Sequence, residues 1–544
     1  MTLASTTTVD HPRAEARETR SLDGEWQFRF EGQGDWRTAV VPGPWQAQFD
    51  DLRTATGTAT YAREFELPEA WRGREVALRF GAVSYFAEVL LNGARLGTHE
   101  GGYLPFEFVL PADLPARSRV EVRATLPSGD ARAYPDFPFA EIPHGKQSWY
   151  GPLGGIWQSV MLEARDPRHI AGCRLRAELA SGRLSLEADV AGEAETLVLV
   201  VLDPDGAEVA SGEAPVAGGR AALTLTLPEV RAWSPDSPAL YRAELRLLAG
   251  GEAVDIRAES VGFRSFEARD GRFYLNGAPF YLRAALDQDY YPDGICTPPS
   301  TAFLKDQLLK AKALGLNMLR CHIKVPDPRY YEVADRLGML VWTEIPNVET
   351  FTERSAARLR QTMEAILARD GNRPCIVAWT IINEDWGTRL RESAEQRRWL
   401  VETFDWLKAA DPGRLVVDNS PCAPNYHVKT DINDYHYYRS VPERREEWDT
   451  ITAEFANGAA WTHSPHGDAV RSGREPLVVS EFGVWGLPDP ARLRGDDGAD
   501  PWWVDYGSTW GDATALPAGM EARFSALGLG TVFGSFEAFI EAVQ

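Results

Sequence analysis

The chain has 544 residues, which is too many for a single hydrophobic core, so several domains are expected. Its composition, 44% hydrophobic and 25% charged, is that of an ordinary globular protein. The formal net charge of -22 argues against nucleic acid or an anionic membrane as a partner, because both are bound through basic patches.

The cysteines and the N-terminus indicate the compartment. Five cysteines lie far apart and form no CxxC pair, and such an odd, sparse set is not a disulfide framework. The first 20 residues are polar and lack the apolar core of a signal peptide. No apolar run reaches the roughly 18 residues that a membrane helix needs. We therefore expect a reduced, cytoplasmic protein without a membrane partner.

The first two segments show the alternation of all-β domains. Residues 1–165 predict a jelly-roll-like β-sandwich, with strands at residues 75–80 and 87–91 and a hairpin signal at Asn92-Gly93. Residues 166–266 predict an immunoglobulin-like sandwich, because strands recur at the spacing of that fold. The clearest of them are residues 185–190, 197–202, 221–227 and 241–247.

In residues 267–544 apolar strands alternate with helical segments, which predicts a parallel sheet buried on both faces. Seven such units fit a (β/α)₈ TIM-type barrel better than an open sheet. The expected strands are residues 280–285, 317–322, 339–344, 376–382, 415–419, 432–437 and 477–481. The expected helices are residues 301–314, 328–337, 355–370 and 390–410.

The end of the chain does not supply an evident eighth strand. Residues 482–544 contain a loop rich in Gly, Asp and Trp, followed by helical spacing at residues 518–527 and 533–543. A closed barrel needs a strand between the first and the seventh. The hypothesis is that this sequence stops before strand eight.

Two acids stand where apolar barrel strands end. The strand before Asn383-Glu384 and the strand before Glu481 each run directly into the carboxylate. Barrel chemistry sits at the carboxyl ends of the strands, so both acids are expected at the barrel mouth. Either acid alone could merely cap a strand or pair with an arginine. Two facing carboxylates without metal ligands favour glycoside hydrolysis.

Motifs along the chain resemble glycoside hydrolase family 2, the group of β-galactosidases, β-glucuronidases and β-mannosidases. The resemblance rests on motifs whose order and spacing agree in all three domains. They are LDGEW at residues 22–26, VPGPW at 41–45, EVLLNG at 88–93, GPLGGIW at 151–157, WSPDSP at 233–238, VGFR at 261–264 and YLNG at 274–277.

The resemblance implies Glu384 as the acid/base, Glu481 as the nucleophile and Asn383 as the partner of the sugar 2-hydroxyl. Asn383 could instead cap a helix. Because family members retain configuration, the two carboxyls should lie about 5–5.5 Å apart. The mechanism also predicts a raised pKa for Glu384 while Glu481 stays ionised.

Further substrate-binding candidates follow other strands, each with structural packing as the alternative. Arg320 and His322 occupy a place where the family reads Arg-x-Ser-His, one residue longer, which puts the role of His322 in doubt. The His-x-Tyr pattern favours Tyr438 over Tyr437 as a donor to the nucleophile. Lys324 is a candidate contact for a uronic acid, with a solvated loop lysine as the commoner case. The complete set of substrate-binding candidates is Asn383, Asp287, Arg320, His322, His436, Tyr438 and Trp485.

The sequence thus predicts a retaining exo-glycosidase that removes a terminal β-linked sugar. A β-galactoside is the first choice and a β-glucuronide the alternative. The alternative of another class is a non-catalytic carbohydrate-binding protein with a degenerate barrel. No HExxH and no Cys/His cluster is present, so no cofactor is expected, and Mg²⁺ or Na⁺ is implied by the resemblance alone. The expected partner is a carbohydrate, and a homo-oligomer is compatible with the sequence.

Overall fold

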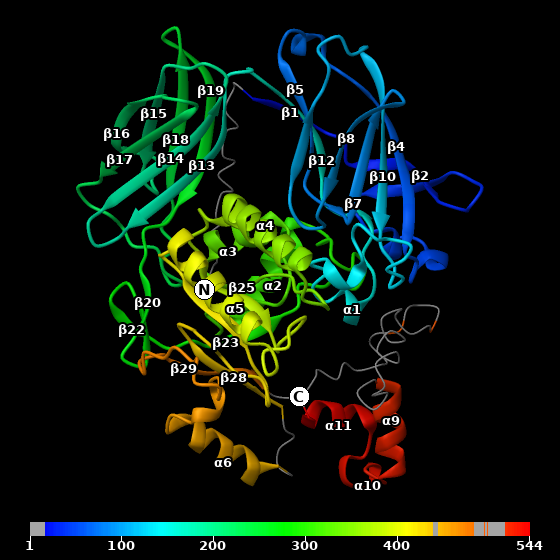
Figure 1. Ribbon diagram of the computed structural model, residues 1–544, viewed down its shortest axis with the longest axis vertical. Coiled ribbons are helices and arrows are strands. Elements are labelled where there is room, and N and C mark those ends of the chain that lie inside the picture. Colours follow the sequence, from blue (N-terminus) through cyan, green and yellow to red (C-terminus); the bar gives the residue numbers. More distant parts are fainter. Residues whose placement is uncertain (1–16, 439–443, 483–493, 495–497, 499–516, 544) are drawn as a thin grey trace.

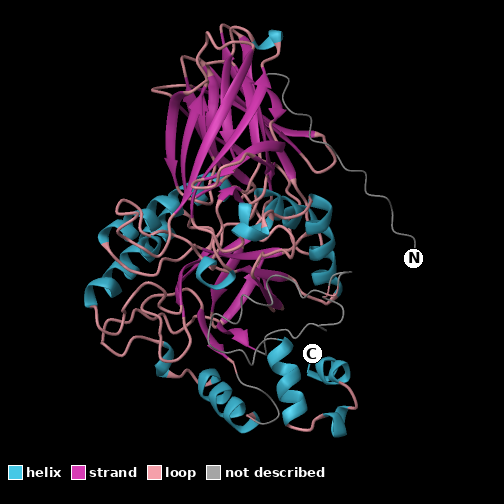
Figure 2. Cartoon of the chain, turned by 90° about the vertical axis from the view of Figure 1, so that its right-hand side faces the viewer, coloured by secondary structure: helices cyan, strands magenta, loops and turns pink. Residues whose placement is uncertain are grey.

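The computed structural model describes residues 17–438, 444–482, 494, 498 and 517–543. Two β-sandwiches lie side by side at one end of the molecule, and a barrel of strands and helices lies beneath them (Figure 1). Figure 2 shows the same division from the side, with most of the helices around the strands of the lower part. Within the described chain, no helix combines the length and the apolar character that crossing a membrane requires.

The first sandwich consists of two main antiparallel sheets, of strand order β1-β12-β5-β9 and β3-β2-β4-β10-β7-β8, with a short pair β11-β6. The Asn92-Gly93 hairpin joins β7 to β8, and both residues have positive φ, as a type I′ turn requires. The strands are β1 (Glu18–Ser21), β2 (Gly24–Phe30), β3 (Arg37–Val41), β4 (Gly57–Glu66), β5 (Glu75–Phe80), β6 (Val83–Ser84), β7 (Phe86–Leu91), β8 (Ala94–Glu100), β9 (Phe106–Val109), β10 (Arg117–Leu126), β11 (Gly155–Ile156) and β12 (Val160–Arg165). A short helix, α1 (Gln147–Tyr150), leaves this domain toward the barrel (Figure 1).

The second sandwich packs a three-stranded sheet, β13-β14-β17, against a four-stranded sheet, β16-β15-β18-β19. Alternate residues of β14 are buried, which is the period-2 pattern of a strand with one face in the core. Its strands are β13 (His169–Glu178), β14 (Arg183–Ala191), β15 (Thr196–Leu202), β16 (Glu208–Pro215), β17 (Arg220–Thr226), β18 (Tyr241–Ala249) and β19 (Glu252–Val261).

The barrel domain begins with an antiparallel hairpin sheet and continues with seven parallel strands. Five of them form one sheet, β23-β24-β25-β26-β27, and two form the pair β28-β29. A parallel bridge between Cys422 and His436 connects the end of β27 to β28. The strands are β20 (Phe266–Arg269), β21 (Arg272–Leu275), β22 (Ala278–Phe280), β23 (Ala284–Asp287), β24 (Met318–Cys321), β25 (Leu340–Glu344), β26 (Ile376–Asn383), β27 (Leu415–Ser420), β28 (Asn433–Tyr437) and β29 (Leu477–Phe482).

Helices follow the parallel strands, and residues typical of helix starts and helix ends stand at their termini. The third helix shows them well: the Asp327 side chain accepts from a first-turn N–H, Pro328 opens the helix, and Gly338 ends it in the left-handed conformation. The helices are α2 (Thr301–Ala313), α3 (Pro328–Leu337), α4 (Glu353–Asp370), α5 (Ala394–Ala410), α6 (Arg445–Ala456), α9 (Pro517–Ala526), α10 (Gly530–Phe533) and α11 (Phe536–Val543).

The predicted fold class is confirmed, with two local differences. The first barrel strand begins at Ala284 and not at residue 280, because Asn276 and Gly277 turn residues 278–280 back onto β21. Helix α6, between β28 and β29, was not predicted. In the part of the chain that the structure describes, no strand follows β29, and the segments with helical spacing near the end are α9, α10 and α11.

Candidate active site

Glu384 directly follows β26 in a backbone conformation that favours glycine. Glu384 and Asp385 have φ of +50° and +58°, the left-handed region that costs energy for residues with a Cβ. Strand β27 holds them there: the Glu384 N–H donates to the Ser420 carbonyl at 2.9 Å, and the Asp385 N–H donates to Asn419 Oδ1 at 3.1 Å. Such enforced strain typically marks a functional position, and here it fixes where the Glu384 carboxyl lies.

Glu481 is buried in β29 among hydrogen-bond donors. The Tyr438 hydroxyl donates a short hydrogen bond to its Oε2. Arg320 Nη1 lies 3.0 Å from its Oε1, and ring nitrogens of His436 and His322 lie 3.3 and 3.4 Å from the same oxygen. These neighbours hold the carboxyl in a fixed orientation.

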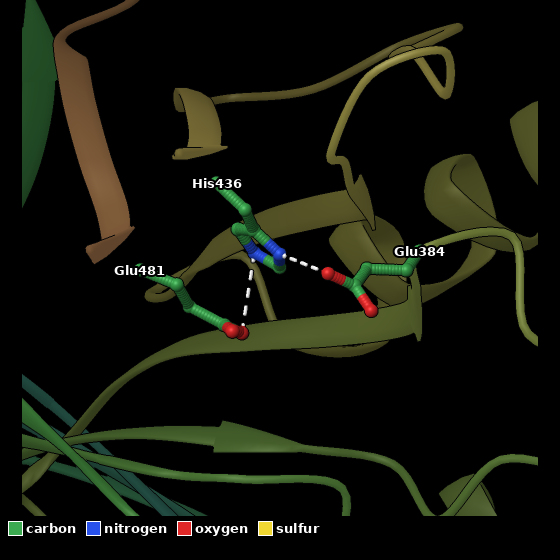
Figure 3. Close-up of side chains that lie close together, drawn as sticks. All are labelled: Glu384, His436 and Glu481. Atoms are coloured by element: carbon green, nitrogen blue, oxygen red, sulfur yellow. Dashed lines mark hydrogen bonds and ion pairs between the residues drawn. The ribbon is translucent and has the colours of Figure 1, made fainter. Parts of the chain in front are cut away.

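The two carboxylates face each other across His436 (Figure 3). One oxygen of each carboxylate and a ring nitrogen of His436 lie within 4.8 Å of one another. The ring contacts Glu384 Oε1 through Nδ1 at 2.8 Å and turns Nε2 toward Glu481. This separation is close to the 5–5.5 Å of retaining glycosidases and well short of the roughly 6.5–9.5 Å that leaves room for water in inverting enzymes.

Arg320 contacts several polar groups of the site at once. Its guanidinium is buried, donates to Glu344 through Nε, and donates through Nη2 to Asn383 Oδ1 and Ser420 Oγ, both at 3.0 Å. Together with the contact to Glu481, these partners occupy all three of its nitrogens. A fork-shaped cation with this many fixed partners determines how the neighbouring groups are oriented.

Glu344, at the end of β25, is a site residue that the sequence analysis missed. Its Oε1 accepts from Arg320 and its Oε2 accepts from the Ile323 N–H at 3.0 Å. Burial raises the pKa of Glu344 to about 7, and the negative charge of Glu481 adds to the shift while Arg320 opposes it. A carboxylate at the end of a third barrel strand was visible in the sequence, but nothing there distinguished it from a strand cap.

The electrostatics of Glu384 differ from the expectation. Burial of its carboxyl raises the pKa, but the hydrogen bond and the charge of His436 outweigh burial, and Lys146 and the Cys422 thiol act in the same direction. The pKa of Glu384 is therefore lowered and not raised in the structure without substrate. The expectation of a raised pKa considered the nearby Glu481 carboxylate. It did not include the hydrogen bond from His436 or the charge of Lys146.

Asn383 is oriented toward the reacting region by its own partners. Its Oδ1 accepts from Arg320, and its backbone N–H donates to Asn347 Oδ1 at 2.9 Å. Its buried Nδ2 has no hydrogen-bond partner among the described residues. An unsatisfied buried donor beside two carboxylates is suited to a ligand hydroxyl.

The remaining predicted residues differ in how closely the structure associates them with the carboxylates. His322 has Nδ1 against Gln288 Nε2 at 2.9 Å and Nε2 near Glu481, and burial lowers its pKa well below the usual value. Asp287 accepts hydrogen bonds from the Tyr330 hydroxyl and the Asp289 N–H, both at 2.8 Å. Among the residues that the structure describes, neither of these contacts links Asp287 to Glu384 or Glu481.

The structure gives Tyr438, Tyr437 and Lys324 different surroundings. Tyr438 reaches Glu481, whereas Tyr437 packs in an aromatic cluster with Tyr435. Lys324 is not a solvated loop residue: its ammonium is fully buried and pairs with Asp289 at 2.7 Å. Trp485 lies outside the described residues.

The first sandwich contributes side chains to the site, which the sequence analysis did not foresee. The charge of Lys146, just before α1, acts on Glu481, Glu384 and Glu344. Its ammonium lies 4.2 Å from the ring centre of Trp149 and 4.7 Å from that of Trp386. No sequence signal connects residue 146 with a strand end in another domain.

Glu384, His436 and Glu481 also have the composition of a metal site, since each offers one ligand atom within 4.8 Å of the others. The surroundings do not fit a metal ion. Arg320 Nη1 lies 3.0 Å from Glu481 Oε1, so an ion on that oxygen would meet a buried guanidinium charge. The donor set suits proton transfer and nucleophilic attack instead.

The fold and the carboxylate pair define a barrel of the glycosidase type, and comparison with known families agrees. Three family models match the chain: the sugar binding domain of glycosyl hydrolases family 2 over residues 18–164, glycosyl hydrolases family 2 over residues 168–264, and the TIM barrel domain of that family over residues 266–490. The chain belongs to glycosyl hydrolase family 2.

Individual relatives fall into two groups. The chain is 28% identical to a β-galactosidase of Aeromonas hydrophila over 73% of its length, but spans 43% of that protein. It is 30% identical to the β-glucuronidase of Homo sapiens over 86% of its length and spans 78% of that protein. The solved structure of a Bifidobacterium dentium β-glucuronidase matches the fold with a TM-score of 0.74 at 20% identity, over 94% of this chain and 90% of the other.

Proposed function

We propose that the protein is a retaining exo-acting β-glycosidase, with Glu481 as nucleophile and Glu384 as acid/base. The observation that carries the proposal is the pair of carboxylate oxygens within 4.8 Å at the carboxyl ends of β26 and β29. The family membership supports the same reaction class. A binding protein without activity would not need two acids held at this separation.

In the first step Glu481 attacks the anomeric carbon of the terminal sugar while Glu384 gives its proton to the leaving oxygen. The contacts of Glu481 support its role, because the Tyr438 hydroxyl and the Arg320 guanidinium hold its carboxyl in place. The Asn383 Nδ2 donor is placed to bind the sugar 2-hydroxyl, where hydrogen bonds strengthen in the transition state.

In the second step Glu384 takes a proton from water, which attacks the glycosyl–Glu481 ester. Once Glu481 is esterified its negative charge is lost, and this lowers the cost of ionising Glu384. The low pKa of Glu384 before substrate binds suits this base role. A bound sugar that displaces water from the carboxyl raises its pKa for the acid role in the first step.

Two sugar classes are in question, a β-galactoside and a β-glucuronide. The sequence favoured the first. The similarity to the β-glucuronidase of Homo sapiens, 30% identity over 86% of this chain against 28% over 73% for the β-galactosidase, favours the second.

A panel of 4-nitrophenyl glycosides tests the proposal. We expect release of nitrophenol from at least one β-glycoside of galactose, glucuronic acid or galacturonic acid, and none from the α-anomers. The first-formed sugar, followed by proton NMR before mutarotation, should be the β-anomer. An α-anomer as first product would contradict the double displacement.

The His436→Phe variant provides a pH test. The ring of the new residue cannot donate to Glu384, so the charged form of that carboxyl loses a stabilising partner and its pKa rises. Because the first step needs protonated Glu384, the fall of kcat/KM at high pH should move to higher pH, whatever the loss in absolute rate. Rate profiles across pH for both proteins measure this. A profile that stays in place or moves to lower pH would show that His436 does not control Glu384.

A further inference from the structure

The segment before α1 is fixed to the barrel by the main chain. The N–H groups of His144 and Gly145 donate to the Asn347 carbonyl at 3.1 Å, and the N–H groups of Glu349 and Thr350 donate to the Ala140 carbonyl at 3.0 and 2.8 Å. Gly145 has φ of +63°, and a Cβ on it would lie 2.3 Å from the Ile323 carbonyl oxygen. The position of Lys146 relative to the carboxylates is therefore set by backbone contacts between the two domains.

The Lys146 ammonium has unusual surroundings. The residue is 5% exposed, and the contacts of its Nζ are the faces of Trp149 and Trp386. Of the described residues, none forms an ion pair or a hydrogen bond with this Nζ. Burying an ammonium without a hydrogen-bond acceptor is costly, and two aromatic faces recover only part of that cost.

The other buried cations of the region are already paired. Arg320 binds Glu344, Glu481, Asn383 and Ser420, and Lys324 binds Asp289. Burial lowers the pKa of Lys146, and the negative charges of Glu481, Glu384 and Glu344 oppose that shift. Lys146 thus faces the carboxylates closely enough to feel their charge, yet beyond the 4.0 Å of an ion pair.

This arrangement locates Lys146 beside the sugar. Glu481 has to reach the anomeric carbon and Glu384 the glycosidic oxygen, so a sugar ring in the reacting position lies against both. The Lys146 ammonium lies against the ring of Trp386, two residues after Glu384. The segment before it is hydrogen-bonded to Asn347, whose side chain accepts from the Asn383 N–H, so Lys146 borders the same sugar ring. An anionic sugar there would be repelled by Glu481 and Glu344 unless a cation received its charge.

We propose that Lys146, supplied by the first sandwich, binds the carboxylate of a uronic acid in the sugar-binding position and makes β-uronides the preferred substrates. This inference rests on the proposed glycosidase function and names its substrate class. A neutral sugar offers Lys146 only hydroxyl groups, which make weaker partners for a buried ammonium than a carboxylate. Glucuronic and galacturonic acid share the recognised group, and they differ at one hydroxyl.

The test compares Lys146→Met and Lys146→Arg with the wild-type chain on 4-nitrophenyl β-glucuronide, β-galacturonide, β-galactoside and β-glucoside. Lys310→Met, on the exposed face of α2, is the matched control. We expect Lys146→Met to lower kcat/KM for the preferred uronide by about 10- to 100-fold, the range of a hydrogen bond to a charged group, and for neutral sugars by less than about 3-fold. Lys146→Arg should keep part of the uronide activity.

Binding of free sugars separates this inference from the proposed function. Calorimetric titration with D-glucuronate, D-galacturonate and D-galactose needs no turnover. The inference predicts that wild type binds a uronate better than galactose and that Lys146→Met loses this preference, with an unchanged thermal midpoint. Wild type that cleaves β-galactosides and neither uronide would sustain the function and overturn the inference. An equal loss for uronides and neutral sugars in Lys146→Met would also overturn it. If that variant does not fold, Lys146→Arg and the wild-type sugar preference decide.

Discussion

The Glu481→Ala variant is expected to lose turnover of every substrate by about 10⁴-fold or more, since no glycosyl-enzyme can form. Added azide should restore release of an activated leaving group, because the small anion enters the space of the missing carboxylate. The product should be the α-glycosyl azide, which is inverted relative to the substrate. Product NMR and the azide dependence of kcat measure this outcome.

A matched control for this variant is Glu364→Ala, an exposed glutamate on α4 that pairs with Arg360 on the same helix. It should retain wild-type activity. A β-glycosyl azide from Glu481→Ala would contradict the nucleophile assignment, because it would mean that azide had replaced the acid/base and not the nucleophile.

The Glu384→Ala variant is expected to respond to the leaving group. For poor leaving groups such as simple alkyl alcohols, kcat/KM should fall by about 10²- to 10⁴-fold, the usual contribution of a general acid. For 2,4-dinitrophenyl glycosides the fall should be far smaller, because that group departs without a proton. Azide should here yield the β-glycosyl azide, by taking the place of water in the second step.

The measurement is a comparison of kcat/KM over leaving groups of decreasing pKa in the variant and the wild type. An equal factor of loss for all leaving groups would rule out Glu384 as the proton donor. In that case Glu344, the buried acid whose pKa is raised to about 7, would be the next residue to replace.

The fold was predictable because its periodic signals are local. Alternation in the sandwiches, the Asn92-Gly93 turn and the apolar runs before Glu384 and Glu481 each act within a few residues. The start of the first barrel strand was misplaced because a turn at Asn276-Gly277 outweighs the apolar character of residues 278–280. Residues 483–493, where Trp485 belongs, are outside the described structure, so the expected role of that residue stays a prediction.

The site was predictable only in part, for a physical reason. Residues at strand ends can be located from sequence, since parallel strands share one edge. The surrounding groups cannot be located in this way. Lys146 reaches the site from another domain. Ser420 contacts Arg320 and His436 and donates to Asp434 through hydrogen bonds that depend on side-chain directions. The pKa of Glu384 is lowered by His436 and Lys146, and the expectation of a raised pKa was wrong because it did not include them.

Covalent trapping tests the central claim most directly. A 2-deoxy-2-fluoro-β-glycosyl fluoride of the preferred sugar forms the glycosyl-enzyme but slows its hydrolysis, so the intermediate accumulates. After inactivation and peptic digestion, mass spectrometry should find one added fluorosugar on the peptide that contains Glu481, and none on that with Glu384. Label on any residue other than Glu481, or inactivation without label, would contradict the account.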